Sequence, residues 1–163
     1  MSTDATPAAS NWAEVLGRVP SGLYILTVRY HDRETGMLAS WVMQAGFEPP
    51  SVTVAVRSDR YVAEWLTDDA PFVLNVVPEG DKTLLKHFGK GFEPEASAFE
   101  GLKIDRSPDG VPVLLDSLGH LECRGRGSVA SGDHKIFLAE ITGGALREAL
   151  SPYVHIRKSG LRY

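Results

Sequence analysis

The chain has 163 residues, 43% hydrophobic and 23% charged, which is the composition of one globular domain with an ordinary core. Its 17 Lys and Arg are outnumbered by 21 Asp and Glu, and the net charge of -4 argues against nucleic acid as a partner. The single cysteine, the polar start and the interrupted apolar runs give no sign of export, a cysteine-rich metal site or a membrane span. We therefore expect a cytoplasmic protein in which a mobile tail, residues 1–10, precedes one domain, residues 11–163.

The first predicted element is a short helix after the tail. Asn11 and Glu14 have the spacing of a capping box, in which each side chain bonds a backbone N–H at the start of a helix. The following residues have helical periodicity. The predicted apolar face consists of Trp12, Val15, Leu16 and Val19.

Most of the remaining chain reads as strands. Short stretches rich in Val, Ile, Leu and Tyr alternate with many of the 16 glycines and 10 prolines. The predicted strands are residues 22–30, 36–46, 51–57, 71–77, 119–130, 134–146 and 153–156. The polar connections 31–36 and 131–133 predict two antiparallel hairpins.

Two more helices are predicted between the strands. One starts at Ser58 or Asp59 and runs to Leu66, and the other runs from Asp81 to Phe88. Residues 91–112 form a long irregular segment of the kind that often covers a site. Since no alternation of parallel strands and helices is present, we expect a mainly β (α+β) fold in which an antiparallel barrel removes the strand edges.

The junction between strand 51–57 and the second helix is a candidate anion site. Arg57 and Arg60 offer guanidinium groups, Ser58 offers a hydroxyl, and a helix start offers free backbone N–H groups. This pattern is typical of a pocket for a phosphate monoester. The alternative is a helix-capping serine beside two solvated arginines.

The segment before the double proline at residues 49–50 is a candidate site for a flat heterocycle. Ser40 and Gln44 are small or polar positions beside the large ring of Trp41. Backbone amides of such a strand can bond the edge of a ring while side chains cover its face. Ordinary strand packing, with Trp41 in the core, is the alternative.

His134 follows Gly132 and Asp133 at a predicted hairpin, where it can act as a donor, a proton relay or only a packed ring. His120 and Glu122 share one face of a strand, but no third ligand has suitable spacing, so we expect no metal site. Cys123 is expected to be a buried strand residue rather than a nucleophile. The sequence lacks a hydrolase nucleophile elbow and a Rossmann nucleotide loop.

Several motifs in order resemble the flavin reductase-like, FMN-binding split-barrel family. They are residues 39–44 (ASWVMQ), 47–50 (FEPP), 52–56 (VTVAV), 71–76 (PFVLNV), 99–102 (FEGL) and 132–134 (GDH). Residues 85–88 (LKHF) and 155–160 (HIRKSG) are similar to the C-terminal flavin reductase modules of diflavin flavodiiron proteins. Flavoredoxins are a further relative, and the resemblance extends over residues 12–163.

The resemblance implies an antiparallel split β-barrel that forms a homodimer and binds FMN near the subunit interface. It implies hydride transfer from NADH or NADPH to the flavin, with His134 near both rings as the candidate catalytic residue. The implied FMN contacts are Ala39, Ser40, Trp41, Val42 and Gln44 at the isoalloxazine and Arg57, Ser58 and Arg60 at the phosphate.

An FMN electron carrier of the flavoredoxin type, which exchanges electrons with protein partners without nicotinamide turnover, is the alternative function. The diflavin proteins also contain a di-iron domain and a flavodoxin domain. Neither is found in these 163 residues, which leaves the electron acceptor open.

Overall fold

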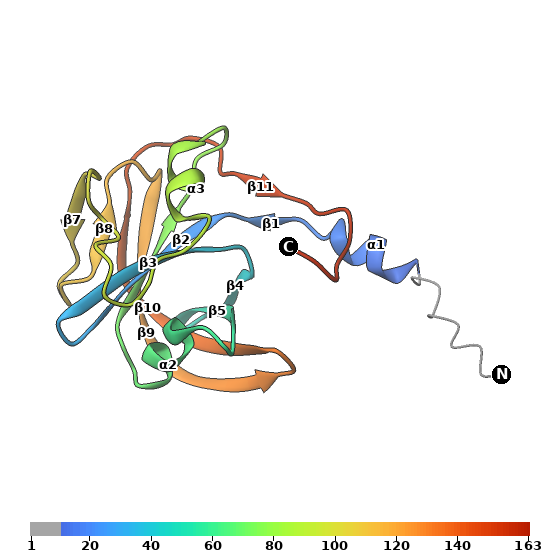
Figure 1. Ribbon diagram of the computed structural model, residues 1–163, viewed down its shortest axis with the longest axis horizontal. Coiled ribbons are helices and arrows are strands. Elements are labelled where there is room, and N and C mark those ends of the chain that lie inside the picture. Colours follow the sequence, from blue (N-terminus) through green and yellow to red (C-terminus); the bar gives the residue numbers. More distant parts are fainter. Residues whose placement is uncertain (1–10) are drawn as a thin grey trace.

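A computed structural model describes residues 11–163 as a seven-stranded antiparallel sheet with three short helices (Figure 1). The sheet has the order β3-β2-β6-β9-β10-β5-β4. In chain order its strands are β2 (Tyr24–Tyr30), β3 (Arg33–Ala39), β4 (Val42–Phe47), β5 (Pro50–Arg57), β6 (Phe72–Val76), β9 (Gly119–Ser131) and β10 (His134–Leu146). Two small sheets pair β1 (Ser21–Gly22) with β11 (Val154–His155) and β7 (Ile104–Arg106) with β8 (Pro112–Leu114). The helices are α1 (Trp12–Gly17), α2 (Tyr61–Thr67) and α3 (Thr83–Phe88).

The connection between β3 and β4 forces the sheet to close. These strands stand at opposite ends of the sheet order, yet only Ser40 and Trp41 join them. In a flat sheet, six spacings of about 4.8 Å would put them roughly 29 Å apart. Three Cα steps, from Ala39 to Val42, reach at most about 11 Å. The sheet therefore curls into a barrel that is split where β3 faces β4, and this confirms the predicted mainly β split barrel.

Two large apolar clusters hold the barrel together, beside a small one of Val73, Val111 and Val113. The larger one joins the sheet to α2 and includes Leu26, Val54, Phe72 and Trp65. The second joins β2 to α3, where Phe88 packs so closely on β3 that a Cβ at Gly36 would meet its ring at 2.6 Å. Successive residues of β2 contribute to different clusters, so this strand has core on both faces.

Asn75 ties three strands together at a fully buried position of β6. Its Nδ2 donates to the Ile25 carbonyl at 2.9 Å and to the Thr27 hydroxyl at 3.1 Å, and its Oδ1 accepts from the Leu114 N–H at 2.8 Å. The Thr27 hydroxyl also lies 2.6 Å from the Pro112 carbonyl, to which it donates. These bonds satisfy polar groups that no water reaches and fix β8 against the sheet.

The two ends of the described chain form an extension that we call the arm, residues 12–22 and 153–163. The β1–β11 pair begins it, and α1 lies far from the sheet (Figure 1). The Arg157 N–H donates to the Gly17 carbonyl at 2.7 Å, and the Gly160 N–H donates to the Ala13 carbonyl at 2.6 Å. Residues 157–160 are thus fastened to α1.

Several predicted elements differ from the structure. Segment 91–112, predicted to be irregular, contains β7 and the first residue of β8, which pair as a small antiparallel sheet. Predicted strand 36–46 is two strands, broken at Ser40 and Trp41, and the turn expected over residues 31–36 occupies only His31 and Asp32. Helix α2 begins at Tyr61, because the Ser58 N–H donates to the Asp133 carbonyl at 2.9 Å and prolongs the β5–β10 edge.

The predicted capping box of α1 is absent. Asn11 has helical backbone angles and makes no side-chain capping bond. Ala13 and Gly17 are the buried residues of α1, whereas the predicted apolar face, with Trp12 and Val15, is exposed. Of that face, only Leu16 packs closely on the rest of the arm, where it lies against Gly160.

Other predicted elements agree more closely with the structure. Strands β9 and β10 lie within a residue of their expected bounds, and the Asp81 carboxylate accepts from the Leu84 N–H at the start of α3. Cys123 is buried in β9, and its burial raises the pKa of the thiol to about 12. The predicted tail, residues 1–10, lies outside the described residues. Among residues 11–163, no helix has the length and apolar character needed to span a bilayer.

Asn75→Ala is expected to lower the free energy of unfolding by about 3 kcal/mol, because it leaves buried backbone groups without partners. Chemical denaturation in urea measures this loss. The matched control is Asn11→Ala, which removes an exposed amide without a capping bond and should change stability by less than about 0.5 kcal/mol. Similar losses in both variants would contradict the role of the Asn75 bonds.

Candidate functional site

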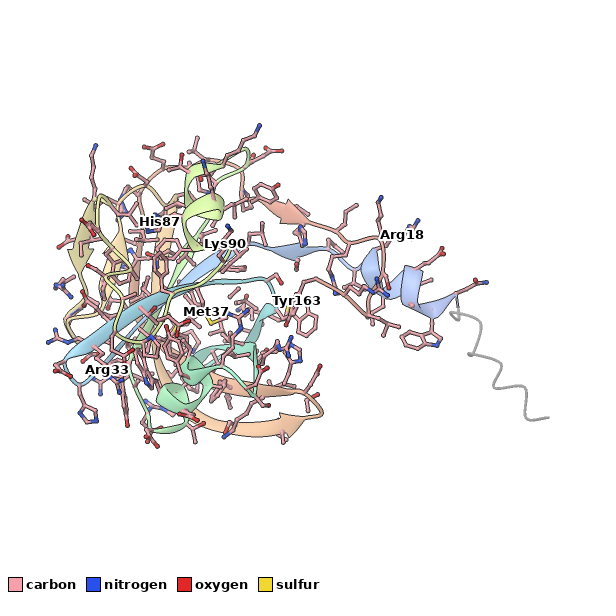
Figure 2. The ribbon with its side chains drawn as sticks, in the orientation of Figure 1. Arg18, Arg33, Met37, His87, Lys90 and Tyr163 are labelled. Carbon is pink, nitrogen blue, oxygen red and sulfur yellow. The ribbon has the colours of Figure 1, made fainter. Side chains whose placement is uncertain are left out.

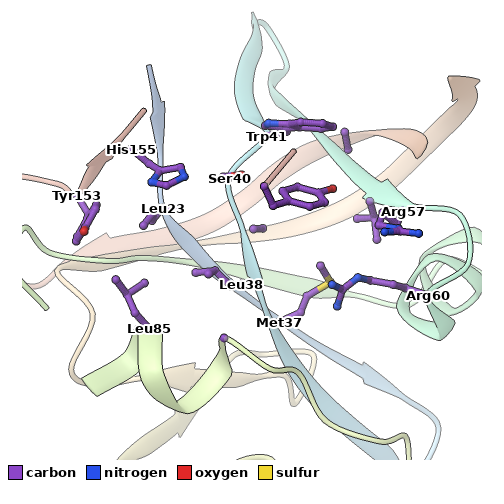
Figure 3. A pocket seen from close by; sticks show the side chains of 15 residues that line it. Leu23, Met37, Leu38, Ser40, Trp41, Arg57, Arg60, Leu85, Tyr153 and His155 are labelled. Atoms are coloured by element: carbon purple, nitrogen blue, oxygen red, sulfur yellow. The ribbon is translucent and has the colours of Figure 1, made fainter. Parts of the chain in front are cut away.

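The split between β3 and β4 opens into a cavity of about 410 Å³, which we call the main cavity (Figure 3). Arg57 and Arg60 lie at one end of it, and Tyr153 and His155 lie at the other. Apolar side chains line the part between the two ends. They are Leu23, Met37, Leu38 and Leu85. The cavity therefore has an apolar middle and a cationic end.

Ser40 and Trp41 line the main cavity because they belong to neither strand ladder. β3 ends at Ala39, which is paired with Tyr24, and β4 begins at Val42. Across this break the Trp41 carbonyl accepts from the Ala55 N–H at 3.0 Å, which anchors the residue to β5. Both side chains are half-buried. The polar and aromatic groups predicted to meet a heterocycle thus stand at the one place where the barrel wall is interrupted.

The two arginines at the cationic end differ in their partners. Arg57 makes a two-point ion pair with Asp59, with contacts of 3.2 and 2.9 Å. Arg60 makes no ion pair with any carboxylate of residues 11–163. Both side chains are exposed, and Arg60 also borders a smaller cavity beside Gly91 and Phe92. Arg60 is consequently the cation most available to an anionic ligand.

His134 stands between an acid and a phenol. Asp133 Oδ1 lies 2.7 Å from Nδ1, and the Tyr163 hydroxyl contacts Nε2. The hydrogen bond from His134 holds the pKa of Asp133 below its ordinary value, so the carboxylate is ionised at neutral pH and accepts the Nδ1 proton. In a neutral imidazole Nε2 then accepts from Tyr163, and the partial burial of the Tyr163 hydroxyl raises the pKa of that phenol, which keeps it protonated.

Two further cavities meet the main cavity at Trp41. The arm cavity, about 590 Å³, lies between the arm and β4, and Val42 and Gln44 line it. The His134 cavity, about 510 Å³, contains His134 and Asp133 and shares Trp41 and Tyr163 with the main cavity. Trp41 is therefore common to all three cavities.

The predicted site residues divide among these cavities. The main cavity takes Ala39, Ser40, Trp41, Arg57 and Arg60. Val42 and Gln44 are in the arm cavity and His134 is in its own. Ser58 is exposed and is not among the main cavity's lining residues, so its contact with a phosphate stays a prediction.

Sequence reasoning assigned no role to Arg157 or Tyr163. The Arg157 guanidinium lies 5.3 Å from the Trp41 ring centre, and the Tyr163 ring lies 5.5 Å from it. The His134 ring is closer, at 4.6 Å. The only sequence signal was the similarity of residues 155–160 to a family motif, which carries no geometry.

The arrangement suits binding of a flat ring with an anionic group rather than acid–base hydrolysis. Residues 11–163 contain no group of three or more His, Cys, Asp or Glu side chains placed to hold a metal ion. Cys123 is buried and keeps its proton, because burial raises the pKa of its thiol. An apolar cavity with an aromatic side chain and a cationic end is what a ring-and-phosphate ligand requires.

Comparisons with known proteins agree with this geometry. Residues 16–161 match the family model described as flavin reductase like domain. The chain is 40% identical over 156 residues to Diflavin flavoprotein A 1 of Synechocystis sp., and this alignment covers 94% of the chain but only 27% of the relative. A putative diflavin flavoprotein A 6 of Nostoc sp. is 39% identical, with 99% and 28% covered. The chain thus spans about a quarter of the length of these relatives.

Among solved structures, the NADH:FAD oxidoreductase SgcE6 of Streptomyces globisporus C-1027 superposes with a TM-score of 0.81. It is 26% identical, and the superposition covers 90% of this chain and 86% of that one. Because the family model covers most of the described residues, this chain belongs to the flavin reductase like domain family.

Proposed function

We propose that the chain binds FMN in the main cavity and transfers hydride from NADH or NADPH to the flavin. The observation that carries the proposal is the pairing of an apolar cavity of about 410 Å³ at Trp41 with Arg57 and Arg60 at one end. FMN has the same division, since its ring system is flat and largely apolar and its phosphate is anionic. The volume also falls within the range of about 300–1,000 Å³ that is usual for cofactor sites.

The residues of the chain then have separate tasks. Trp41 and Met37 would cover the ring, backbone groups of Ser40 and Trp41 would meet its polar edge, and Arg60 would hold the phosphate. A bound flavin supplies the hydride-accepting ring, so no nucleophile is needed from the protein. The protein contributes a fixed ring position, an electrostatic anchor and exclusion of water.

Two observations support a nicotinamide as the hydride donor. The oxidoreductase of Streptomyces globisporus, similar to this chain over most of both lengths, is named for NADH. In this chain the His134 cavity lies next to the main cavity, so two rings have neighbouring places that share Trp41. His134 is the candidate to orient the second ring.

The alternative function is an FMN electron carrier that exchanges electrons with protein partners. The names of the diflavin flavoproteins favour it, because there the matching part is only about a quarter of a larger flavoprotein. Nicotinamide turnover decides between the two functions.

Arg60→Ala is expected to weaken FMN binding roughly tenfold to hundredfold, since a charge-assisted bond to the phosphate is lost. Riboflavin, which has the same ring without the phosphate, should bind as it does to the wild type. Quenching of flavin fluorescence measures both affinities. Arg57→Ala should lose less, because Asp59 already engages that guanidinium.

Asp59→Asn is the matched control for the two arginines. It frees Arg57 from its carboxylate, so FMN binding should tighten by roughly threefold and riboflavin binding should not change. Equal losses for both flavins in Arg60→Ala would place the phosphate elsewhere and assign the effect to ring binding or folding.

Mixing the FMN-loaded protein with NADH or NADPH under anaerobic conditions should bleach the flavin absorbance within a stopped-flow experiment. His134→Ala should slow bleaching without weakening FMN binding, because this residue lies outside the main cavity. Bleaching only by a reduced protein donor, and by neither nicotinamide, would select the electron carrier.

A homodimer is part of the proposal. Strand β4 and the arm expose large apolar side chains, among them Phe47 at 90% and Met43 at 65% exposure, and Met43 lines the arm cavity. Such a patch is more than a small monomer usually leaves in water. Light scattering should give about 35 kDa, twice the 17.7 kDa of one chain.

Phe47→Asp should shift the mass toward that of one chain, because a charge would be buried in the interface. The control is Leu146→Asp, which changes an exposed leucine. His134 begins β10 and Leu146 ends it, and this variant should leave the mass unchanged. A monomer mass for the wild type at all concentrations, with FMN bound, would contradict the dimer.

A further inference from the structure

Tyr163 lies in the space where the main cavity and the His134 cavity meet, and it lines both. Its ring is tilted by 33° to Trp41, and its hydroxyl bonds Nε2 of His134. Figure 2 shows it in the region between the arm and the barrel. The Tyr163 ring, a flat ring with a hydrogen-bond donor, thus already lies beside Trp41, where we propose that the flavin ring binds.

The hold on Tyr163 is local. The Arg157 and Gly160 N–H groups bond carbonyls of α1, and the Arg157 guanidinium donates to the Arg162 carbonyl at 2.9 Å. At Gly17 a Cβ would meet the Arg157 carbonyl oxygen at 2.6 Å, so only glycine allows this close approach. The hydrogen bonds between residues 157–160 and α1 therefore hold Tyr163 close to Trp41.

Beyond Gly160 the segment has little to hold it down. Leu161 is 63% exposed and Tyr163 is 70% exposed, so displacing them uncovers no core. The contacts that would be lost are the hydrogen bond to His134, the bonds from Arg157 to the Arg162 carbonyl and from the Leu161 N–H to Ser159 Oγ, and the ring contacts with Trp41 and His134. An incoming aromatic ring can replace these few contacts with its own stacking and hydrogen bonds.

We propose that Tyr163 is a displaceable internal ligand, which competes with the isoalloxazine ring for Trp41 and with donor groups for His134 Nε2. This inference rests on the proposed function, because it assumes that a flavin ring binds at Trp41. A ligand then binds only the fraction of molecules in which residues 161–163 have moved aside, and its apparent affinity is reduced by that fraction. Removing the competitor raises the affinity, whereas removing a stacking partner lowers it.

The test is riboflavin binding to the full chain freed of flavin, followed by quenching of flavin fluorescence. Tyr163→Ala should bind riboflavin roughly tenfold more tightly than the wild type, and Tyr163→Phe, which keeps the ring and loses the hydroxyl bond, roughly threefold more tightly. Gly17→Ala should also tighten binding, because it pushes residues 157–159 away without touching the ring. Ile156→Ala, an exposed change on the same arm, is the control and should have no effect.

A second readout follows His134 itself. In imidazole ¹⁵N spectra the His134 Nε2 signal should shift on adding riboflavin to the wild type and should already be shifted in free Tyr163→Phe. Unchanged or weaker riboflavin binding by Tyr163→Ala, with FMN still bound by the wild type, would overturn this role of Tyr163 and leave the proposed function standing. Failure of all variants to bind either flavin would overturn both.

Discussion

The whole molecule depends on one covalent constraint, the two-residue link between the outer strands of the sheet. The link of Ser40 and Trp41 is too short to span an open sheet, so the barrel must close. Neither residue belongs to a strand on either side of the link. The wall is consequently interrupted where these two residues stand. Fold and site therefore have a common origin, since the residues that close the barrel are those that line its opening.

The electrostatics of the site follow from the neighbouring junction. β5 runs into the turn before α2, which places Arg57 and Arg60 at the same end of the main cavity. Asp59 neutralises one of them and leaves the other unpaired. Within the described residues, this end of the main cavity offers one guanidinium without an ion pair, which suits one terminal anionic group better than several.

Local signals in the sequence were enough for much of the fold. The β9–β10 hairpin was predictable because its turn chemistry at Gly132 and its apolar strands are adjacent in the chain. The break at Ser40 was not predictable, because residues 37–45 contain no Gly or Pro to mark it, and β3 ends where pairing with β2 stops and pairing with β5 begins. Periodicity likewise identified the apolar side of α1 but not whether anything covers it.

The site was predictable in composition and less so in arrangement. The residues around Trp41 and the two arginines were found from residue type and motif, and the structure brings five of the predicted positions to one cavity. The contact between His134 and Tyr163 joins residues 29 positions apart and depends on the arm, so no local pattern contains it. Ser58 shows the opposite case, in which a typical capping residue has its backbone drawn into strand pairing.

The buried thiol has a practical consequence for how copies of this chain associate. Cys123 is the only cysteine, and because burial raises the pKa of its thiol to about 12, the thiol keeps its proton at neutral pH and little reactive thiolate forms. Crosslinking by air oxidation is correspondingly slow. Two copies of the native chain are therefore not expected to be joined by a Cys123 disulfide, and a reducing agent should not change the mass of any assembly that they form.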